Sequence, residues 1–115
     1  MITAVFQRNQ QDQITDFLIT GHADSGPYGQ DIVCAAVSIT SLGTINCLQA
    51  IAQTSPQVIQ NETEGGYLQC HLDYQVLTNH DHLIAAQTLM LACYQNLFAL
   101  TTDYADFIQV QLKNS

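Results

Sequence analysis

Apolar and β-branched residues concentrate in two short segments at the start of the chain. Met1–Gln7 and Gln13–Thr20 are rich in Ile, Val, Phe and Thr, the residue types that favour strands. The residues between them, Arg8–Asp12, are polar, which is typical of a turn. The beginning of the chain therefore predicts a β-hairpin.

Strict alternation of apolar and polar side chains predicts a later strand over Tyr67–Leu77. One face carries Leu68, Cys70, Leu72, Tyr74 and Val76, and the other carries Tyr67, Gln69, His71, Asp73 and Gln75. Gln57–Glu62 predicts a short strand before it, and Gly65-Gly66 separates the two. Phe107–Leu112 alternates again, which predicts a last strand. Its apolar face carries Ile108, Val110 and Leu112.

Two longer segments, Asp31–Thr54 and His82–Thr101, repeat apolar side chains at helical spacing. The first stripe is Val33, Ala36, Val37, Thr40, Thr44, Cys47, Leu48 and Ile51, and the second is Leu83, Gln87, Met90, Leu91, Tyr94, Leu97 and Phe98. Asp31 is a candidate N-cap for the first helix, and Asn79 or Asp81 for the second. Gly43 inside the first helix costs about 1 kcal/mol relative to alanine. That cost indicates close packing there or a break in the helix.

The order of these elements, β-β-α-β-β-α-β, predicts an α+β fold with two long helices packed on a mostly antiparallel sheet. The 115 residues fit one domain, 1–115, without a repeat or linker. The start of the chain lacks the basic and apolar regions of a secretory signal. No stretch approaches the ~18–20 apolar residues of a membrane span. We therefore expect a cytoplasmic protein that does not bind membranes.

The charge balance excludes one large class of partners. Ten acidic residues face two basic ones, Arg8 and Lys113, for a net charge of −8. No basic patch can be built from two residues at opposite ends of the chain, so recognition of nucleic acid through its phosphates is excluded. A cationic partner is favoured instead. The hydrophobic content of 47% indicates a folded core.

The chain offers little for a metal or a cofactor. Its four cysteines, Cys34, Cys47, Cys70 and Cys93, form no CxxC motif, so we expect reduced thiols, most of them buried. His80, Asp81 and His82 are too close in sequence to face one another on a helix, so they are typical of a solvated helix start. The sequence has no glycine-rich nucleotide-binding motif, so we expect no nucleotide cofactor.

The segment from Gly21 to Ser38, GHADSGPYGQDIVCAAVS, carries the candidate chemistry. Its first part, Gly21–Gln30, is a glycine-rich loop that places His22 just after a strand. If Asp31 is the N-cap, Cys34 occupies the third helical position, where backbone N–H groups lack acceptors and the helix dipole favours a thiolate. Those N–H groups can also hold a developing oxyanion.

The roles of the neighbouring side chains stay open at this point. His22 can act as a base and then as an acid toward a leaving amine. Asp31 either caps the helix, orients His22, or disfavours the thiolate by its own charge. The structural alternative is an inert core cysteine and a surface histidine, because one cysteine and one histidine at this spacing can arise by chance.

This segment closely resembles the signature of the ribosomal-processing cysteine protease Prp family. That signature has Gly-His-Ala, a variable loop ending in Gly, and then Asp-Ile-Val-Cys-Ala-Ala-Val-Ser. The matching residues are Gly21, His22, Ala23, Gly29, Asp31, Ile32, Val33, Cys34, Ala35, Ala36, Val37 and Ser38. The chain departs from the signature at Asp24-Ser25-Gly26, in the variable loop. Length and element order extend the resemblance more loosely over the whole chain.

The resemblance implies an endopeptidase with Cys34 as nucleophile and His22 as its base. The implied substrate is the N-terminal extension of a large-subunit ribosomal protein precursor, cleaved after bulky aromatic residues and before a small one. Gly21, Ala23, Gly29 and Ser38 are then substrate-binding residues, and the chain is expected to form a homodimer.

Two other readings of the sequence remain. One is a non-catalytic acidic module that binds ribosomal or other basic proteins. The other is a thiol redox sensor that uses Cys34.

Overall fold

The elements of the chain follow one another in the predicted order. The computed structural model describes residues 1–21, 30–61 and 65–115, with only the backbone at Gln30 and Asp31. The elements are β1 (Ile2–Arg8), β2 (Ile14–Thr20), α1 (Gln30–Ala50), β3 (Gln57–Gln60), β4 (Tyr67–His71), the 3₁₀ turn η1 (Tyr74–Val76), α2 (His80–Asp103) and β5 (Ile108–Asn114). The α+β prediction is therefore confirmed.

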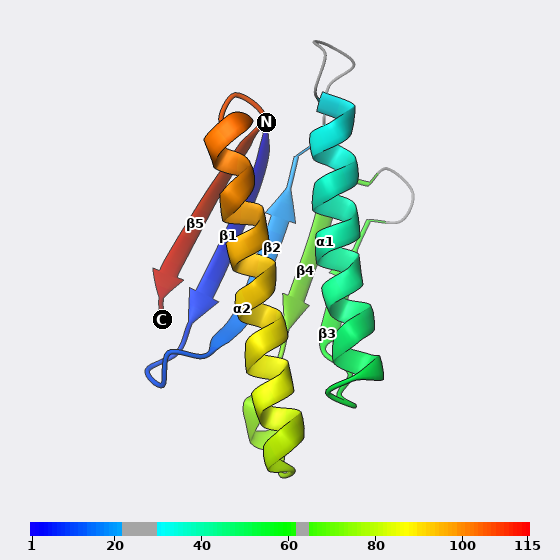
Figure 1. Cartoon of the computed structure of the whole chain (residues 1–115), viewed down its shortest axis with the longest axis vertical. Helices are drawn as coiled ribbons and strands as arrows, with labels where there is room; N and C mark the ends of the chain where they lie inside the picture. Colours follow the sequence, from blue (N-terminus) through cyan, green and yellow to red (C-terminus); the bar gives the residue numbers. More distant parts are fainter. Residues whose placement is uncertain (22–29, 62–64) are drawn as a thin grey trace.

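The five strands form one sheet in the order β3-β4-β2-β1-β5. Neighbouring strands are antiparallel except β1 and β5, which are parallel. Both helices lie on the same face of this sheet, with α1 over the β3–β4 side and α2 over the β1–β5 side (Figure 1). The sheet is thus mostly antiparallel and covered on one face, as predicted.

The core lies between the helices and the covered face of the sheet. Strand side chains alternate because successive residues of a strand point to opposite faces. The buried strand residues are Ile2, Ala4, Phe6, Ile14, Phe17, Ile19, Leu68, Cys70 and Ile108, and they pack with Val33, Val37, Leu48, Met90, Cys93 and Leu97 of the helices. The N-terminal half of α1 thereby lies near Ile2 at the start of β1 and Ile19 near the end of β2, where the candidate site lies.

The predicted strand Tyr67–Leu77 is wrong in its second half. β4 ends at His71, and the chain then forms η1, where the Asp73 side chain accepts a hydrogen bond from the Gln75 N–H at 2.9 Å. Tyr74 stays buried and its hydroxyl donates to the Ile14 carbonyl at 2.7 Å, whereas Val76 is 64% exposed. A local side-chain acceptor thus ends the strand, although the apolar alternation continues.

The first helix differs from its prediction at both ends and in the middle. α1 begins at Gln30, so Asp31 lies inside the first turn and is not the N-cap, and the helix ends at Ala50 instead of Thr54. The helix is unbroken at Gly43, and a Cβ atom added there would meet no atom within 4 Å. Both expectations for Gly43, close packing and a helix break, were therefore wrong.

The second helix is capped by Asn79, whose side chain accepts a hydrogen bond from the His82 N–H at 3.1 Å, so Asp81 is not the cap. Its fully buried residues are Ala86, Met90, Cys93 and Leu97. Leu91 and Phe98 of the predicted stripe are about half exposed, at 50% and 49%. The buried stripe is rotated relative to the prediction because small side chains, Ala86 and Cys93, face the sheet.

Both helices are longer and more apolar than the sequence analysis expected. Ile32–Ala50 and His80–Asp103 are each long and apolar enough, by length and composition alone, to cross a membrane. Core helices of folded domains meet the same criterion, and here both helices pack on the sheet. The expectation that no stretch approaches the length of a membrane span was therefore wrong. Packing of the helices on the core accounts for part of their apolar content.

Candidate active site

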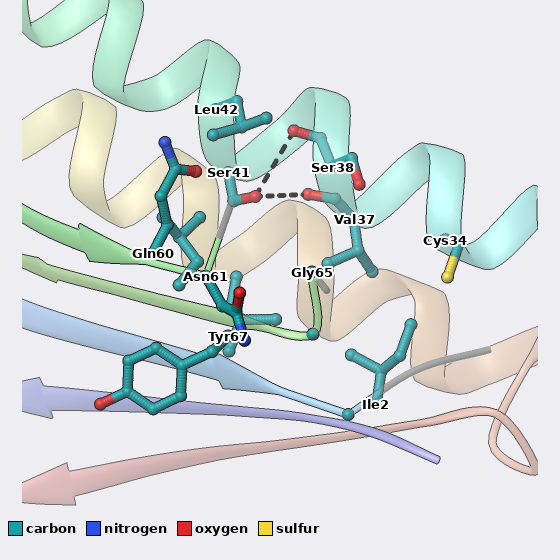
Figure 2. A pocket seen from close by; sticks show the side chains of 14 residues that line it. Ile2, Cys34, Val37, Ser38, Ser41, Leu42, Gln60, Asn61, Gly65 and Tyr67 are labelled. Atoms are coloured by element: carbon teal, nitrogen blue, oxygen red, sulfur yellow. Dashed lines mark hydrogen bonds between the residues drawn. The ribbon is translucent and has the colours of Figure 1, made fainter. Parts of the chain in front are cut away.

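A groove runs along α1 at the end of the sheet where the candidate motif lies. It encloses about 210 Å³ between α1 and the β3–β4 hairpin. Its lining consists of Ile2, Ile19, Gly21, Cys34, Val37, Ser38, Ser41, Leu42, Gln60, Asn61, Gly65, Gly66, Tyr67 and Leu68. Figure 2 shows Cys34 near one end of the groove and Leu42, Gln60 and Asn61 near the other. None of these lining residues is charged, although the protein carries a net charge of −8.

α1 places Cys34 and Ser38 one turn apart on the side of the helix that faces the groove. Cys34 is half-buried, so its thiol packs against the core and still borders the groove. Ser38 is exposed at the rim. Ser38, which the resemblance implies as a substrate-binding residue, thus lines the same groove as Cys34.

The position of Cys34 in α1 differs from the sequence prediction. Because α1 begins at Gln30, Cys34 is the fifth helical residue and not the third. The N–H groups without intrahelical acceptors end before Cys34, so its own N–H is not among them. The expected third helical position of Cys34 was therefore wrong, whereas oxyanion binding by the N–H groups at the helix start stays a prediction.

Gly21 connects the end of β2 to the candidate motif in a conformation that needs glycine. Its φ is +101°, and its N–H donates to the Gly66 carbonyl at 3.0 Å. A Cβ atom at Gly21 would overlap the Met1 carbonyl oxygen and lie 3.3 Å from the Ile2 Cα. The backbone of β1 and the β3–β4 hairpin thus hold Gly21 between them, which fixes where the chain leaves the sheet toward residue 22.

The β3–β4 hairpin forms the wall opposite α1. Gly65 and Gly66 both have positive φ, at 69° and 76°, and the Gly65 N–H donates to the Asn61 carbonyl at 2.9 Å. Asn61 and Tyr67, on either side of this connection, both line the groove. Sequence reasoning had treated Gly65-Gly66 only as a separator between strands and had missed this wall, because pairing of β4 with β2 brings it there.

The other cysteines lie in surroundings different from that of Cys34. Cys70 and Cys93 are buried, and desolvation raises the pKa of Cys70 to about 12 and that of Cys93 to about 11. Cys47 is half-buried on α1 but does not line the groove. The prediction of a buried core role is confirmed for Cys70 and Cys93, and Cys34 is the thiol that borders the groove.

Three predicted residues fall outside the described part of the chain, namely His22, Ala23 and Gly29. Asp31 is placed in the first turn of α1 by its backbone alone. The groove therefore brings together Cys34, Ser38 and Gly21, and the chain enters the His22 segment directly from Gly21. Among the described residues, no three His, Cys, Asp or Glu side chains gather as metal ligands.

Comparison with known proteins gives a consistent result. The family model described as "Cysteine protease Prp" matches residues 1–109. The "Ribosomal processing cysteine protease Prp" of Staphylococcus aureus (strain Mu50 / ATCC 700699) is 31% identical over 98% of this chain and 100% of that protein.

Solved structures agree with this match. The crystal structure of SMU.848 from Streptococcus mutans has a TM-score of 0.85 and 31% identity, covering 100% of this chain and 96% of that one. Prp from S. aureus in complex with a substrate peptide has a TM-score of 0.82 and 26% identity, covering 98% of this chain and 100% of that one. The same protein with a covalently linked product peptide also has a TM-score of 0.82.

Proposed function

Since the chain belongs to the Prp family of cysteine proteases, we propose that it removes the N-terminal extension of a large-subunit ribosomal protein precursor. Cys34 is the proposed nucleophile and His22 its general base and acid. The observation that carries the proposal is the position of Cys34, the one groove-lining thiol among the described residues, in a groove whose described lining residues are uncharged.

The proposed reaction follows from these two side chains. His22 accepts the thiol proton while the Cys34 sulfur attacks the carbonyl carbon of the scissile bond. The tetrahedral intermediate then expels the amine, which takes the proton back from His22, and a thioester remains on Cys34. Water, deprotonated by His22, attacks the thioester, releases the carboxylate product and restores the thiol.

The remaining site residues have supporting roles in this proposal. Gly21, Ala23, Gly29 and Ser38 bind the peptide backbone and side chains, and Asp31 supports the site from the first turn of α1. Ser38 and Gly21 border the groove beside Cys34, which is consistent with contact to the substrate. The reaction needs no metal or cofactor, because the nucleophile and the proton carrier are both side chains.

The decisive experiment incubates the protein with a peptide that spans the precursor's extension and identifies the products by mass spectrometry. Cys34→Ala and His22→Ala should each abolish cleavage, whereas Cys47→Ala, which removes a half-buried thiol outside the groove, should cleave like the wild type. Cleavage that survives Cys34→Ala would refute the assignment of the nucleophile. Peptide binding without cleavage by the wild type would favour a non-catalytic binding module, and a stable sulfenic acid on Cys34 after mild peroxide would favour a redox sensor.

The acidic charge suggests how the precursor is selected. A large-subunit ribosomal protein is cationic because it binds RNA, so a protease of net charge −8 attracts it and is repelled by RNA. We propose that cleavage occurs in the cytoplasm, before the ribosomal protein joins the ribosome, and that the protein contacts neither nucleic acid nor a membrane. Raising the salt concentration should lower kcat/KM for the whole precursor, and an unchanged value would exclude electrostatic steering.

We also propose that the chain forms a homodimer through the outer face of α2. Ile84, Leu91 and Phe98 are about half exposed and follow one another at seven-residue spacing, as in helices that pack together. Residues 82–102 contain no Asp, Glu, Lys or Arg, so two acidic chains can meet there without facing carboxylates. Phe98→Glu should yield a monomer in sedimentation velocity, whereas Val76→Glu should not.

A further inference from the structure

A second hollow lies at the end of the molecule opposite the groove, and we call it the far cleft. It consists of two adjoining parts of about 360 and 220 Å³, which share His71, Leu72 and Asp73. The larger part is lined by the β1–β2 turn, η1 and the start of α2, and the smaller part by the residues that join α1 to β3. Figure 1 shows the β1–β2 turn and the start of α2 at this end, away from the N-terminus.

Hydrogen bonds hold the walls of the far cleft in place. In the β1–β2 turn, the side chain of Asn9 accepts a hydrogen bond from the Gln11 N–H at 3.0 Å. On the facing side, the buried Tyr74 hydroxyl donates to the Ile14 carbonyl at 2.7 Å and ties η1 to β2. Because both walls are fixed by the protein itself, a ligand does not have to order them on binding.

Asp73 supplies the carboxylate of the far cleft. Its Oδ1 accepts a hydrogen bond from the Gln75 N–H at 2.9 Å, and no donor in the described part of the chain bonds to its second oxygen. No Lys or Arg is present among the described lining residues. Arg8, one of the two basic residues of the chain, is engaged elsewhere, 3.6 Å from Asp12 and hydrogen-bonded to Asn114 at 2.9 and 3.0 Å. The charge of Asp73 is therefore not neutralised by a side chain of this protein.

His71 offers a second acceptor beside Asp73. Its Nδ1 lies 2.8 Å from the Asp16 carboxylate, across the pairing of β2 with β4. The neutral ring therefore carries its proton on Nδ1 and a lone pair on Nε2. Asp16 is fully occupied, because its other oxygen accepts a hydrogen bond from the Thr15 hydroxyl at 2.6 Å. The far cleft thus contains a carboxylate and an imidazole lone pair two residues apart in the chain.

The remaining lining suits the side chain of lysine or arginine. Leu72 and Leu83 supply apolar surface on which an aliphatic stem can lie. The side chains around them are mostly neutral amides and hydroxyls, namely Asn9, Gln11, Gln13, Gln75, Thr54 and Ser55. A cationic head, which carries only donors, finds acceptors at Asp73 and His71, whereas an anionic group would meet the Asp73 charge with no base beside it.

We propose that the far cleft binds a basic segment of the precursor while the extension of the same precursor lies in the groove. This inference rests on the proposed function, since it adds a second, distant contact with the same substrate. The net charge of −8 favours such a partner, and the far cleft gives that attraction a defined place. Two linked contacts raise the affinity for the precursor without any change at the reacting bond.

The fold sets the spacing between the two contacts. Thr54 of the far cleft donates through its N–H to the Leu48 carbonyl at 3.1 Å, and Leu48 lies fourteen residues after Cys34 in α1. At a rise of ~1.5 Å per residue, this part of the far cleft is about 20 Å from Cys34 along the helix. An extended chain, which advances ~3.3 Å per residue, covers that distance in about six residues.

A series of precursor-extension peptides tests this spacing. Each peptide carries a pair of lysines, or of norleucines as the uncharged match, at a different distance on either side of the scissile bond. A lysine pair about six or more residues away on one side should raise kcat/KM about two- to fivefold over norleucine, mainly through KM, as expected for an exposed charge contact. A nearer pair should have a smaller effect. An equal advantage of lysine at every distance would indicate attraction by net charge alone and overturns the proposal.

Asp73→Asn should abolish the advantage of the distant lysine pair and leave the norleucine peptides unaffected. The variant is expected to fold, because asparagine keeps the oxygen that accepts the Gln75 N–H and is an equally good cap. Asp81→Asn is the matched control, since it removes one exposed charge from the first turn of α2 without lining the far cleft, and it should keep the advantage. A lysine advantage that survives Asp73→Asn, or that both variants reduce equally, overturns the proposal.

A second variant tests the space without changing the charge. Gln75→Trp replaces an exposed side chain of the larger part with a bulky one and should reduce the lysine advantage as Asp73→Asn does. Gln109→Trp, at an exposed position of β5 outside the far cleft, is the control and should retain it. Equal lysine advantages in the two tryptophan variants overturn the assignment to this cleft.

A binding experiment separates this inference from the proposed function. The peptide acetyl-Gly-Lys-Lys-Gly-amide, and its norleucine counterpart, are titrated into isotope-labelled wild type and Asp73→Asn while the amide NMR signals of residues 71–75 are followed. If the wild type cleaves no extension peptide but the lysine probe shifts these signals in an Asp73-dependent manner, the proposed function fails and the far cleft stands. If the extension peptide is cleaved but the lysine probe shifts none of these signals, the proposed function stands and the inference is overturned.

Discussion

Replacing Gly21 with alanine tests whether the geometry at the start of the candidate motif is held as tightly as the structure indicates. Gly21 has a φ of +101°, a conformation that L-residues rarely adopt, and its Cα faces the backbone of Met1 and Ile2. The added methyl would overlap the Met1 carbonyl oxygen and lie 3.2 Å from the carbonyl carbon. Both contacts are to backbone, so no side chain can rotate to make room.

The expected cost has two parts. A non-glycine residue in this region of φ costs about 1–3 kcal/mol. Moving the start of β1 to relieve the overlap adds about 1–3 kcal/mol, as in other overpacked sites. Together they predict a loss of about 2–6 kcal/mol, which is a large share of the ~5–15 kcal/mol that stabilises a typical domain. Because Ile2 lines the groove and Gly21 leads into His22, kcat/KM should also fall.

Urea unfolding followed by circular dichroism measures the stability change, and peptide cleavage measures the activity change. Gly43→Ala is the matched control, because a Cβ atom there meets no atom within 4 Å and the helix is regular. It should stabilise the protein by about 0.5–1 kcal/mol and leave cleavage unchanged. If Gly21→Ala unfolds at the same urea concentration as the wild type, or both alanine variants shift in the same direction, this reasoning is refuted.

In the folded protein a thiol-alkylating reagent should modify Cys34 before Cys70 and Cys93, which are buried with raised pKa values, and equal rates for all three would contradict the site. These two buried thiols should leave the free energy of unfolding unchanged below pH 9 and lower it as the pH rises through about 11 to 12, because they ionise first in the unfolded chain. A free energy of unfolding that stays constant over this alkaline range in urea titrations would contradict this. A peptide tag fused before Met1 should lower kcat/KM more than the same tag fused after Ser115. The Met1 carbonyl lies beside Gly21 of the groove, whereas Ser115 lies beside Arg8 at the far end of the sheet. Equal activities of the two fusions would argue against this placement.

The elements were predictable because their hydrophobic patterns are regular, and the errors fall where a local interaction competes with the pattern. The alternation through Val76 predicts a strand, but the Asp73 side chain bonds to the Gln75 N–H and starts a 3₁₀ turn. Periodicity cannot register such a contact. Leu91 and Phe98 fit a helical stripe equally well, yet the helix turns smaller side chains toward the sheet.

The candidate site was predictable in part. The motif places Cys34 and Ser38 on one side of a helix, and Gly21 at the end of a strand, because these relations are local. The opposite wall, with Asn61 and Tyr67, depends on the pairing of β4 with β2, a contact between distant segments that no local pattern reveals.

Within the described chain, every residue that lines the groove falls between Ile2 and Leu68. α2 and β5 follow this segment, complete the core under β1 and β2, and contribute no described lining residue. Substitutions on the outer surface of the C-terminal segment can therefore accumulate without altering the peptide groove. If the proposed homodimer forms through α2, peptide choice and self-association can diverge independently among related chains, and each can be engineered without redesigning the other.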